Sequence, residues 1–186
     1  MRMPTWIFTY GTLMSTATCD VGRAERAAMA RSATPGGPAS LRGRMYDVGL
    51  YPAAVPTPLA LSRIHGEIWQ LPPDHDDLLA MLDRYEGCGP GCDPVPPYRR
   101  TRMSVRTRDG RRVQTWMYVW NRSTSGLMPI PDGRWREPDD ASGRIDILRR
   151  PQGARLITQG PGRAASAAAG MVDGPPLPRW LQAGQR

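Results

Sequence analysis

Residues 98–120 of the chain read YRRTRMSVRTRDGRRVQTWMYVW, and this stretch carries its clearest structural signal. Strand-favouring residues fill two runs, Tyr98–Thr107 and Arg111–Trp120, and Asp109-Gly110 between them is typical of a tight turn. In the second run, large side chains occupy both alternating faces, as expected for a strand that is covered on both sides. The sequence therefore predicts a β-hairpin that forms part of the centre of a sheet or barrel.

The beginning of the chain is expected to form a strand followed by a helix. Trp6–Tyr10 is a short run of strand-favouring residues that stops at Gly11, where a tight turn follows. Small apolar residues then recur at helical spacing over residues 20–31, with Asp20 as the expected N-cap. The Pro-Gly-Gly-Pro sequence at residues 35–38 is expected to end this helical segment.

Two further strands are expected in the middle of the chain. Strand-like stretches cover residues 40–48 and 59–71. The segment between them is rich in proline, with Pro52, Pro56 and Pro58, and we interpret it as a connection.

A second helix has clearer signals than the first. It is expected to begin after Pro72-Pro73, with Asp74 or Asp76 as its cap, and to end at Gly87. One face of this helix is apolar, and its members are Leu78, Leu79, Leu82 and Tyr85.

The 186 residues suffice for one domain, and their composition divides the chain into two parts. Hydrophobic residues make up 40% of the chain, which is enough to form a core, but large apolar residues become rare after residue 137. We therefore expect a folded domain over residues 1–137 and a disordered tail over residues 138–186. The sequence shows no export signal and no membrane-spanning run, so we expect a cytoplasmic protein without a membrane partner.

The formal charge of +8 comes entirely from arginine, because lysine is absent. The densest group of arginines lies between Arg99 and Arg112, on the predicted hairpin, where alternation places several of them on a solvated face. A nucleic-acid surface is the alternative, and it would give binding that depends steeply on salt. That stretch lacks the interleaved aromatic residues that stack on bases, so we expect no nucleic-acid partner.

The common routes to catalysis find little support in the sequence. The three cysteines, Cys19, Cys88 and Cys92, do not combine with His65 or His75 into a pattern typical of a metal site. Glycine patterns of nucleotide-binding loops and the nucleophile elbow of serine hydrolases are also absent from the sequence. We expect no metal and no organic cofactor, with His65 in a strand and His75 at a helix start.

Two segments remain as candidates for a functional site. The segment Tyr10-Gly11-Thr12-Leu13 leaves a strand at a glycine, and such a loop can present successive backbone N–H groups to a carboxylate or phosphate. Glu86 falls in the last turn of the second predicted helix, whose negative end should raise the pKa of a carboxyl group. An ordinary turn and a surface glutamate are the alternative interpretations.

Seven segments spread over residues 6–136 resemble, in the same order, the γ-glutamylcyclotransferase-like family and its AIG2-like branch. They are FTYGTL at 8–13, RGRMYDVG at 42–49 with YP at 51–52, HGEIW at 65–69, LDRYEG at 82–87, YRR at 98–100, WMYV at 116–119 and DGRW at 132–135. The resemblance implies an α+β fold, a small mixed β-barrel with short surrounding helices. The tail after Arg150 has no counterpart in the family pattern.

The resemblance also implies an activity. A member of this family converts a small γ-glutamyl amide to 5-oxoproline and releases an amine or amino acid, without metal or cofactor. The resemblance assigns substrate binding to Tyr10, Gly11, Thr12 and Leu13, and the general acid/base role to Glu86. The loop between Cys88 and Pro97 is unusually rich in glycine, proline and cysteine, so the identity of the group released from the γ-glutamyl unit stays open. The alternative is a non-catalytic module that uses the same pocket to bind a small carboxylate or a partner.

Ending the chain after Pro138 is expected to preserve both folding and turnover. The few large apolar residues of the tail cannot offset the entropy lost in ordering it. Circular dichroism and release of 5-oxoproline check this expectation. A truncated protein that folds but is inactive would show that the tail contributes to the site.

Overall fold

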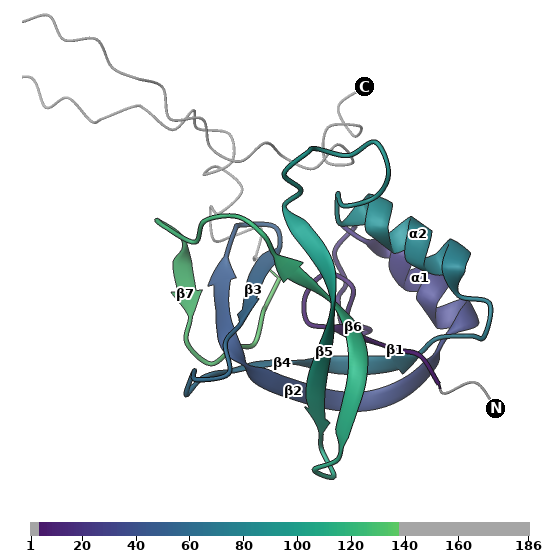
Figure 1. The fold of residues 1–186 in the computed structure, drawn as a ribbon, viewed down its shortest axis with the longest axis horizontal. Helices are drawn as coiled ribbons and strands as arrows, with labels where there is room; N and C mark the ends of the chain where they lie inside the picture. Colours follow the sequence, from purple (N-terminus) through teal and green to yellow (C-terminus); the bar gives the residue numbers. More distant parts are fainter. Residues whose placement is uncertain (1–3, 138–186) are drawn as a thin grey trace, which may run out of the picture.

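The structure is a computed structural model, and it describes residues 4–137 of the chain. In this part it contains two helices and seven strands (Figure 1). The tail predicted for residues 138–186 lies outside the described residues.

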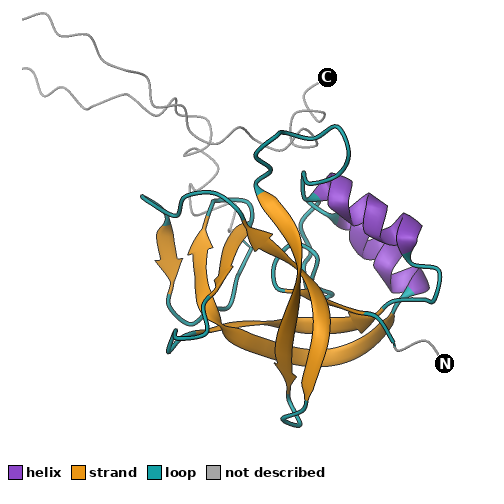
Figure 2. Cartoon of the chain, in the orientation of Figure 1, coloured by secondary structure: helices purple, strands orange, loops and turns teal. Residues whose placement is uncertain are grey.

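Five strands close into a mixed barrel, which confirms the fold class predicted from the sequence (Figure 2). These strands are β1 (Trp6–Thr9), β2 (Thr34–Asp47), β4 (Arg63–Gln70), β5 (Tyr98–Thr107) and β6 (Arg112–Trp120). They follow the order β2-β4-β1-β6-β5, and a pairing of Ala39 with Thr107 joins β5 back to β2. The pairing of β1 with β6 is parallel and the others are antiparallel, which makes the barrel mixed.

The predicted hairpin is present with nearly the predicted bounds. Strands β5 and β6 pair from Tyr98 with Trp120 down to Arg106 with Arg112, and Gly110 adopts a φ of 87° in the turn. Both faces of β6 are covered, as expected: Met117 lies in the barrel core, whereas Trp120 packs in the second core described below.

Two short strands were not predicted. The proline-rich segment interpreted as a connection contains β3 (Pro52–Pro56), and β7 (Met128–Ile130) pairs with the same part of β2. Proline is tolerated in β3 because an edge strand does not need every backbone N–H for a ladder. The three residues of β7 are too short for a sequence pattern to identify.

The helical segment ends before residues 35–38, as expected, but the prediction that the next strand begins at residue 40 was wrong, because β2 begins six residues earlier, at Thr34. These residues pair with β4 through an irregularity between Pro35 and Gly37, and Gly37 has a φ of 87°. Glycine is also required at position 36, because a Cβ there would lie 2.5 Å from the Trp6 ring. The glycines thus permit a bulge that continues the strand.

The helices are α1 (Arg23–Ser32) and α2 (Asp76–Tyr85), which lie side by side against one side of the barrel (Figure 1). The aspartates predicted as caps were wrong, because Gly22 and His75 occupy the two N-cap positions, although His75 does lie at a helix start as expected. Asp20 instead forms an ion pair with Arg23, and its backbone carbonyl accepts the Arg23 N–H. The predicted apolar face of α2 is confirmed: Leu78, Leu79, Leu82 and Tyr85 are buried.

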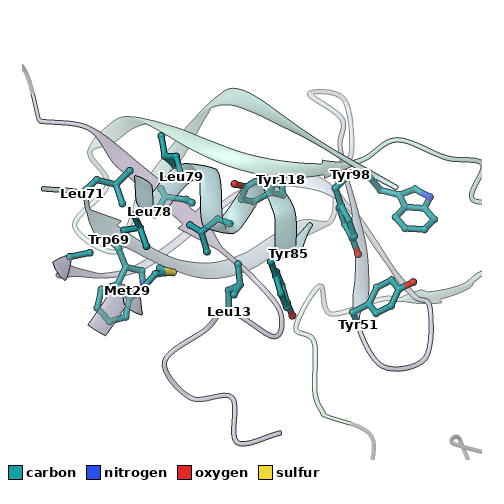
Figure 3. Close-up of a cluster of buried hydrophobic side chains, with 14 of the residues drawn as sticks. Leu13, Met29, Tyr51, Trp69, Leu71, Leu78, Leu79, Tyr85, Tyr98 and Tyr118 are labelled. Atoms are coloured by element: carbon teal, nitrogen blue, oxygen red, sulfur yellow. The ribbon is translucent and has the colours of Figure 1, made fainter. Parts of the chain in front are cut away.

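The side chains of the strands divide between two cores. Phe8 points into the barrel with residues such as Met45, Ile64 and Met117. The neighbouring Ile7 points to the other face, where the helices cover the barrel and bring Leu78, Leu82 and Met29 into a second core (Figure 3). The second core continues to the residues of the candidate site.

Replacement of Gly66 by alanine is expected to destabilise the barrel by about 3 kcal/mol. A Cβ at this position would lie 2.0 Å from the backbone oxygen of Thr9, so β1 and β4 would have to separate. Urea denaturation measures the loss.

The control is Gly89→Ala in a loop, where the nearest atoms to an added Cβ are Arg84 Cγ and the Arg84 backbone nitrogen, both at 3.3 Å. We expect this change to cost about 1 kcal/mol or less. Equal losses in the two variants would contradict the role of close backbone approach at Gly66.

Candidate functional site

A pocket of about 360 Å³, open to solvent, lies where the end of β1 meets the end of α2. Four segments that are distant in sequence line it: the loop after β1, the start of β3, the end of α2 and the start of β5. Their lining residues are Tyr10, Gly11, Thr12, Tyr51, Pro52, Tyr85, Glu86 and Tyr98.

The loop after β1 approaches the pocket through its backbone. A Cβ on Gly11 would lie 2.6 Å from Pro52 Cγ, so only glycine fits between β1 and β3 without displacement. The Met14 N–H donates to the Gly11 carbonyl at 2.9 Å and closes the turn. Within residues 4–137, the N–H groups of Gly11 and Thr12 donate no hydrogen bond, which leaves them for an anionic ligand.

Two charged side chains hold this loop in place. The Glu67 carboxylate on β4 accepts hydrogen bonds from the Ser15 backbone N–H at 2.5 Å and the Ser15 hydroxyl at 2.8 Å. The Arg26 guanidinium on α1 donates to the backbone carbonyls of Thr12, Val21 and Cys19. The loop is therefore a fixed part of the site. Glu67 stands in the HGEIW segment that carried the family resemblance, but its contact with Ser15, 52 positions away, could not be read from the sequence. No sequence signal pointed to Arg26.

Tyrosine side chains form most of the pocket wall, and three of their hydroxyl groups make hydrogen bonds. Tyr10 donates to the Tyr118 carbonyl at 2.6 Å, Tyr98 donates to the Pro52 carbonyl at 2.7 Å, and the Tyr85 hydroxyl lies 2.7 Å from Thr12 Oγ1. Figure 3 shows Tyr51, Tyr85 and Tyr98 together at one end of the second core. The wall is therefore rigid and largely apolar.

Glu86 is the acidic residue of the pocket lining. It follows the last residue of α2, and its N–H continues the helical pattern to the Leu82 carbonyl at 2.9 Å. Its side chain is partly buried, and within the described residues no hydrogen bond or ion pair engages its carboxylate. Burial raises the pKa of Glu86 to about 8, and the negative charges of Glu25 and Asp83 add to the effect. The sequence predicted this direction but attributed it to the helix end.

Asp83, three residues earlier, has the opposite environment. Its carboxylate forms an ion pair with Arg100 at 2.8 Å and accepts a hydrogen bond from the Tyr118 hydroxyl at 2.8 Å. Among the hairpin arginines that alternation was expected to place partly on a solvated face, Arg100 does not lie on such a face: its guanidinium pairs with Asp83 and lies 4.7 Å from the centre of the Trp116 ring. These contacts fix the end of α2 on the hairpin.

The structure brings together most, but not all, of the side chains proposed from the sequence. Tyr10, Gly11, Thr12 and Glu86 line one pocket, whereas the Leu13 side chain lies in the second core. Tyr51, Pro52, Tyr85 and Tyr98 also line the pocket without having been proposed as site residues. All four stand inside segments that carried the family resemblance, which was the available signal.

In the part of the chain that the structure describes, no three His, Cys, Asp or Glu side chains form a group suited to a metal ion. Cys19, Cys88 and Cys92 are free thiols, and His65 lies in β4, as expected. Neither described helix has the length and hydropathy needed to cross a membrane.

Sequence comparisons with known proteins indicate one family. A sequence model described as "Gamma-glutamyl cyclotransferase, AIG2-like" matches residues 7–137. The Gamma-glutamylcyclotransferase family protein YtfP from Escherichia coli K12 is 30% identical over 96 residues, which cover 52% of this chain and 70% of that protein.

Solved structures show the same fold. An AIG2-like protein from Mus musculus has a TM-score of 0.50 at 20% identity, and the match covers 75% of this chain and 99% of that chain. YkqA from Bacillus subtilis has a TM-score of 0.51 at 16% identity, and the match covers 80% of this chain but only 44% of that larger chain.

The raised pKa of Glu86 makes stability depend on pH. Between pH 4.5, the ordinary pKa of a glutamate, and about pH 8, the folded protein retains a proton that the unfolded chain releases. The stability that protonated Glu86 contributes is thus complete below pH 4.5 and is lost as the pH rises through 8. The Glu86→Gln side chain cannot ionise. The free energy of unfolding of this variant minus that of the parent protein should therefore increase by a few kcal/mol from pH 5 to pH 9.

Urea denaturation at the two pH values measures this difference. Asp74→Asn, at an exposed position before α2, serves as the control and should show the same small effect at both pH values. A constant difference between Glu86→Gln and the parent protein at both pH values would show that the carboxyl group is not desolvated.

Proposed function

The chain belongs to the AIG2-like gamma-glutamyl cyclotransferase family, and from this premise we propose that it converts a γ-glutamyl amide to 5-oxoproline, with release of an amine or amino acid. The observation that carries the proposal is the position of Glu86. Its carboxyl group, with a pKa raised to about 8, borders the same pocket as the loop whose Gly11 and Thr12 N–H groups are unoccupied in the described chain. A proton acceptor and anion-binding donors are the groups that this reaction needs.

The reaction is an intramolecular aminolysis. The α-amine of the glutamyl unit forms a bond to its own γ-carbonyl carbon, and the bond from that carbon to the amide nitrogen then breaks. The ionised Glu86 takes one proton from the α-ammonium group and delivers it to the leaving nitrogen. The second proton, which the attacking nitrogen loses when the ring closes, is taken up by the released amine, which leaves as its ammonium ion. No water is consumed, and the charge that develops on the γ-oxygen requires a hydrogen-bond donor.

The loop is proposed to hold the glutamyl unit. Its N–H groups at Gly11 and Thr12 suit the α-carboxylate, and Tyr10 and Leu13 position this backbone: Tyr10 through the bond to the Tyr118 carbonyl, and Leu13 through its place in the core. A folded glutamyl chain already brings the amine close to the carbonyl, so less entropy is lost in reaching the transition state. The fixed tyrosine wall supports this folded conformer.

A pKa near 8 is suited to a group that both accepts and donates a proton near neutral pH. At pH 7 most of the Glu86 carboxyl groups are protonated, and the basic form increases as the pH rises through 8. We therefore expect kcat/KM to rise over this range.

Glu86→Gln is expected to lower kcat/KM by roughly 10²- to 10⁴-fold, because glutamine keeps the shape of the side chain but cannot take a proton. The measurement is 5-oxoproline formation, detected by mass, from a panel of γ-glutamyl amides. Binding of the substrate should be largely retained.

Asp83→Asn is the matched control, because it neutralises the other carboxylate of the same helix end. Asp83 contacts Arg100 and Tyr118, so its loss should reduce stability, and the folded fraction should keep kcat within about tenfold of the parent value. Full activity in Glu86→Gln, or inactivity of folded Asp83→Asn, would refute the assignment. Binding without turnover in the parent protein would favour the non-catalytic module.

A further inference from the structure

The loop that joins β3 to β4, residues 57–62, carries two leucines that stand almost fully in solvent. Leu59 is 90% exposed and Leu61 is 99% exposed, which makes them the most exposed large hydrophobic side chains of the described residues. Figure 1 shows this loop on the side of the barrel away from α1 and α2. Single apolar side chains are normal on a protein surface, but a pair on one loop favours contact with another apolar surface.

Backbone hydrogen bonds hold this loop in one conformation. The Thr57 N–H donates to the Arg42 carbonyl and the Gly43 N–H donates to the Ser62 carbonyl, both at 3.2 Å, so both ends of the loop are tied to β2. Between the two leucines, Ala60 is buried, and its N–H donates to the Thr57 carbonyl at 3.0 Å. The leucines are therefore presented to solvent by a fixed turn.

Arginine side chains without a carboxylate partner surround the base of the loop. Arg42 donates from its guanidinium to the Pro58 carbonyl at 3.3 Å, and it pairs across β2 and β4 with Arg63, which directly follows the loop. Arg44 is the next exposed residue of β2. Within residues 4–137, no ion pair engages any of these three guanidinium groups.

The neighbouring segment after β7 does not neutralise this charge. It contacts β4 where the His65 N–H donates to the Gly133 carbonyl at 2.9 Å. The carboxylate of this segment, Asp132, pairs with Arg136 at 2.6 Å, and the exposed Arg134 adds a further positive charge. The loop therefore combines exposed apolar side chains with a positively charged surround.

A lipid membrane fits this combination better than a protein partner does. Two leucines on a projecting turn offer a convex contact, and a bilayer accepts such side chains without a matching cavity. The arginines can keep their charged ends at anionic headgroups while their stems lie over apolar surface. A second copy of this chain would instead bring like charges together.

We propose that the loop of residues 57–62 attaches the protein to an anionic lipid membrane, with Leu59 and Leu61 inserted at the boundary between headgroups and acyl chains and the three arginines at the headgroups. Such a contact needs no membrane-spanning run, so the expectation of no membrane partner, which rested on the lack of one, does not extend to it. The pocket stays separate: Pro52 lines it at the start of β3, whereas the loop follows the other end of this strand.

Flotation of the full chain with lipid vesicles tests the proposal. We expect binding to vesicles of phosphatidylcholine with about 30% phosphatidylserine, and at least about tenfold weaker binding to phosphatidylcholine alone. Added salt should weaken binding to the anionic vesicles. Equal binding to both kinds of vesicle, or binding to neither, would overturn the proposal.

The leucines are tested together. Leu59→Ser combined with Leu61→Ser should lower the partition coefficient on the anionic vesicles by at least about tenfold, because burial of one leucine is worth roughly this factor. Both side chains are exposed, so the variant should fold like the parent protein, which circular dichroism checks. Val95→Ser, at an exposed position of another loop, is the control and should leave binding unchanged. Unchanged binding in the leucine variant would show that the loop is not the contact.

The arginines are tested in the same way. Arg42→Gln combined with Arg44→Gln should weaken binding by about tenfold. Arg31→Gln combined with Arg84→Gln removes the same charge from exposed positions of α1 and α2, and it should have a smaller effect. An equal loss in the two double variants would mean that only the overall charge matters, and would refute the role of this face.

Sedimentation distinguishes the membrane from a second copy. A monomeric parent protein that floats with the anionic vesicles supports the proposal. If the parent protein is a dimer that the leucine substitutions dissociate, and it does not float with vesicles, the loop is an interface between copies and the proposal is wrong.

Discussion

The ion pair between Asp83 and Arg100 joins the last turn of α2 to the β5–β6 hairpin, and the candidate site is organised around this contact. A half-buried ion pair is stable only when its remaining hydrogen-bonding capacity is satisfied, and here Tyr118 donates its hydroxyl to the same carboxylate. The backbone carbonyl of Tyr118 accepts the Tyr10 hydroxyl. One chain of contacts thus connects the helix end, strand β6 and the start of the loop.

Two carboxylates only three residues apart consequently have different chemistry. Asp83 is surrounded by donors, whereas within the described residues the Glu86 carboxylate has neither a hydrogen-bond donor nor a cation in contact, and burial raises its pKa. The charge of Asp83 itself contributes to that rise. Environments that separate the behaviour of neighbouring carboxyl groups are a general means of providing an acid/base group near neutral pH. Here the separation follows from which residue of the helix end faces the hairpin and which faces the cavity.

Gly11 shapes the wall of the pocket opposite the end of α2. Its missing side chain allows β1 and β3 to approach at Pro52, and its backbone borders the pocket that Glu86 lines. The loop is held from two different elements, by Glu67 on β4 and Arg26 on α1. Charged side chains therefore provide rigidity around the pocket, while the pocket wall itself remains mainly aromatic.

Elements whose signals lie within one short segment could be predicted from the amino-acid sequence. The alternation in residues 98–120, the apolar face of α2 and the end of β1 shortly before Gly11 were all readable, and the ordered motifs located Glu86. Three features could be found only in the folded protein: residues 35–38 belong to β2, Tyr51 and Tyr98 line the pocket, and burial is the main cause of the raised pKa of Glu86. The difference is one of range: periodicity and turn chemistry act between near neighbours, whereas burial, strand pairing and cavity walls arise from residues that closure of the barrel brings together.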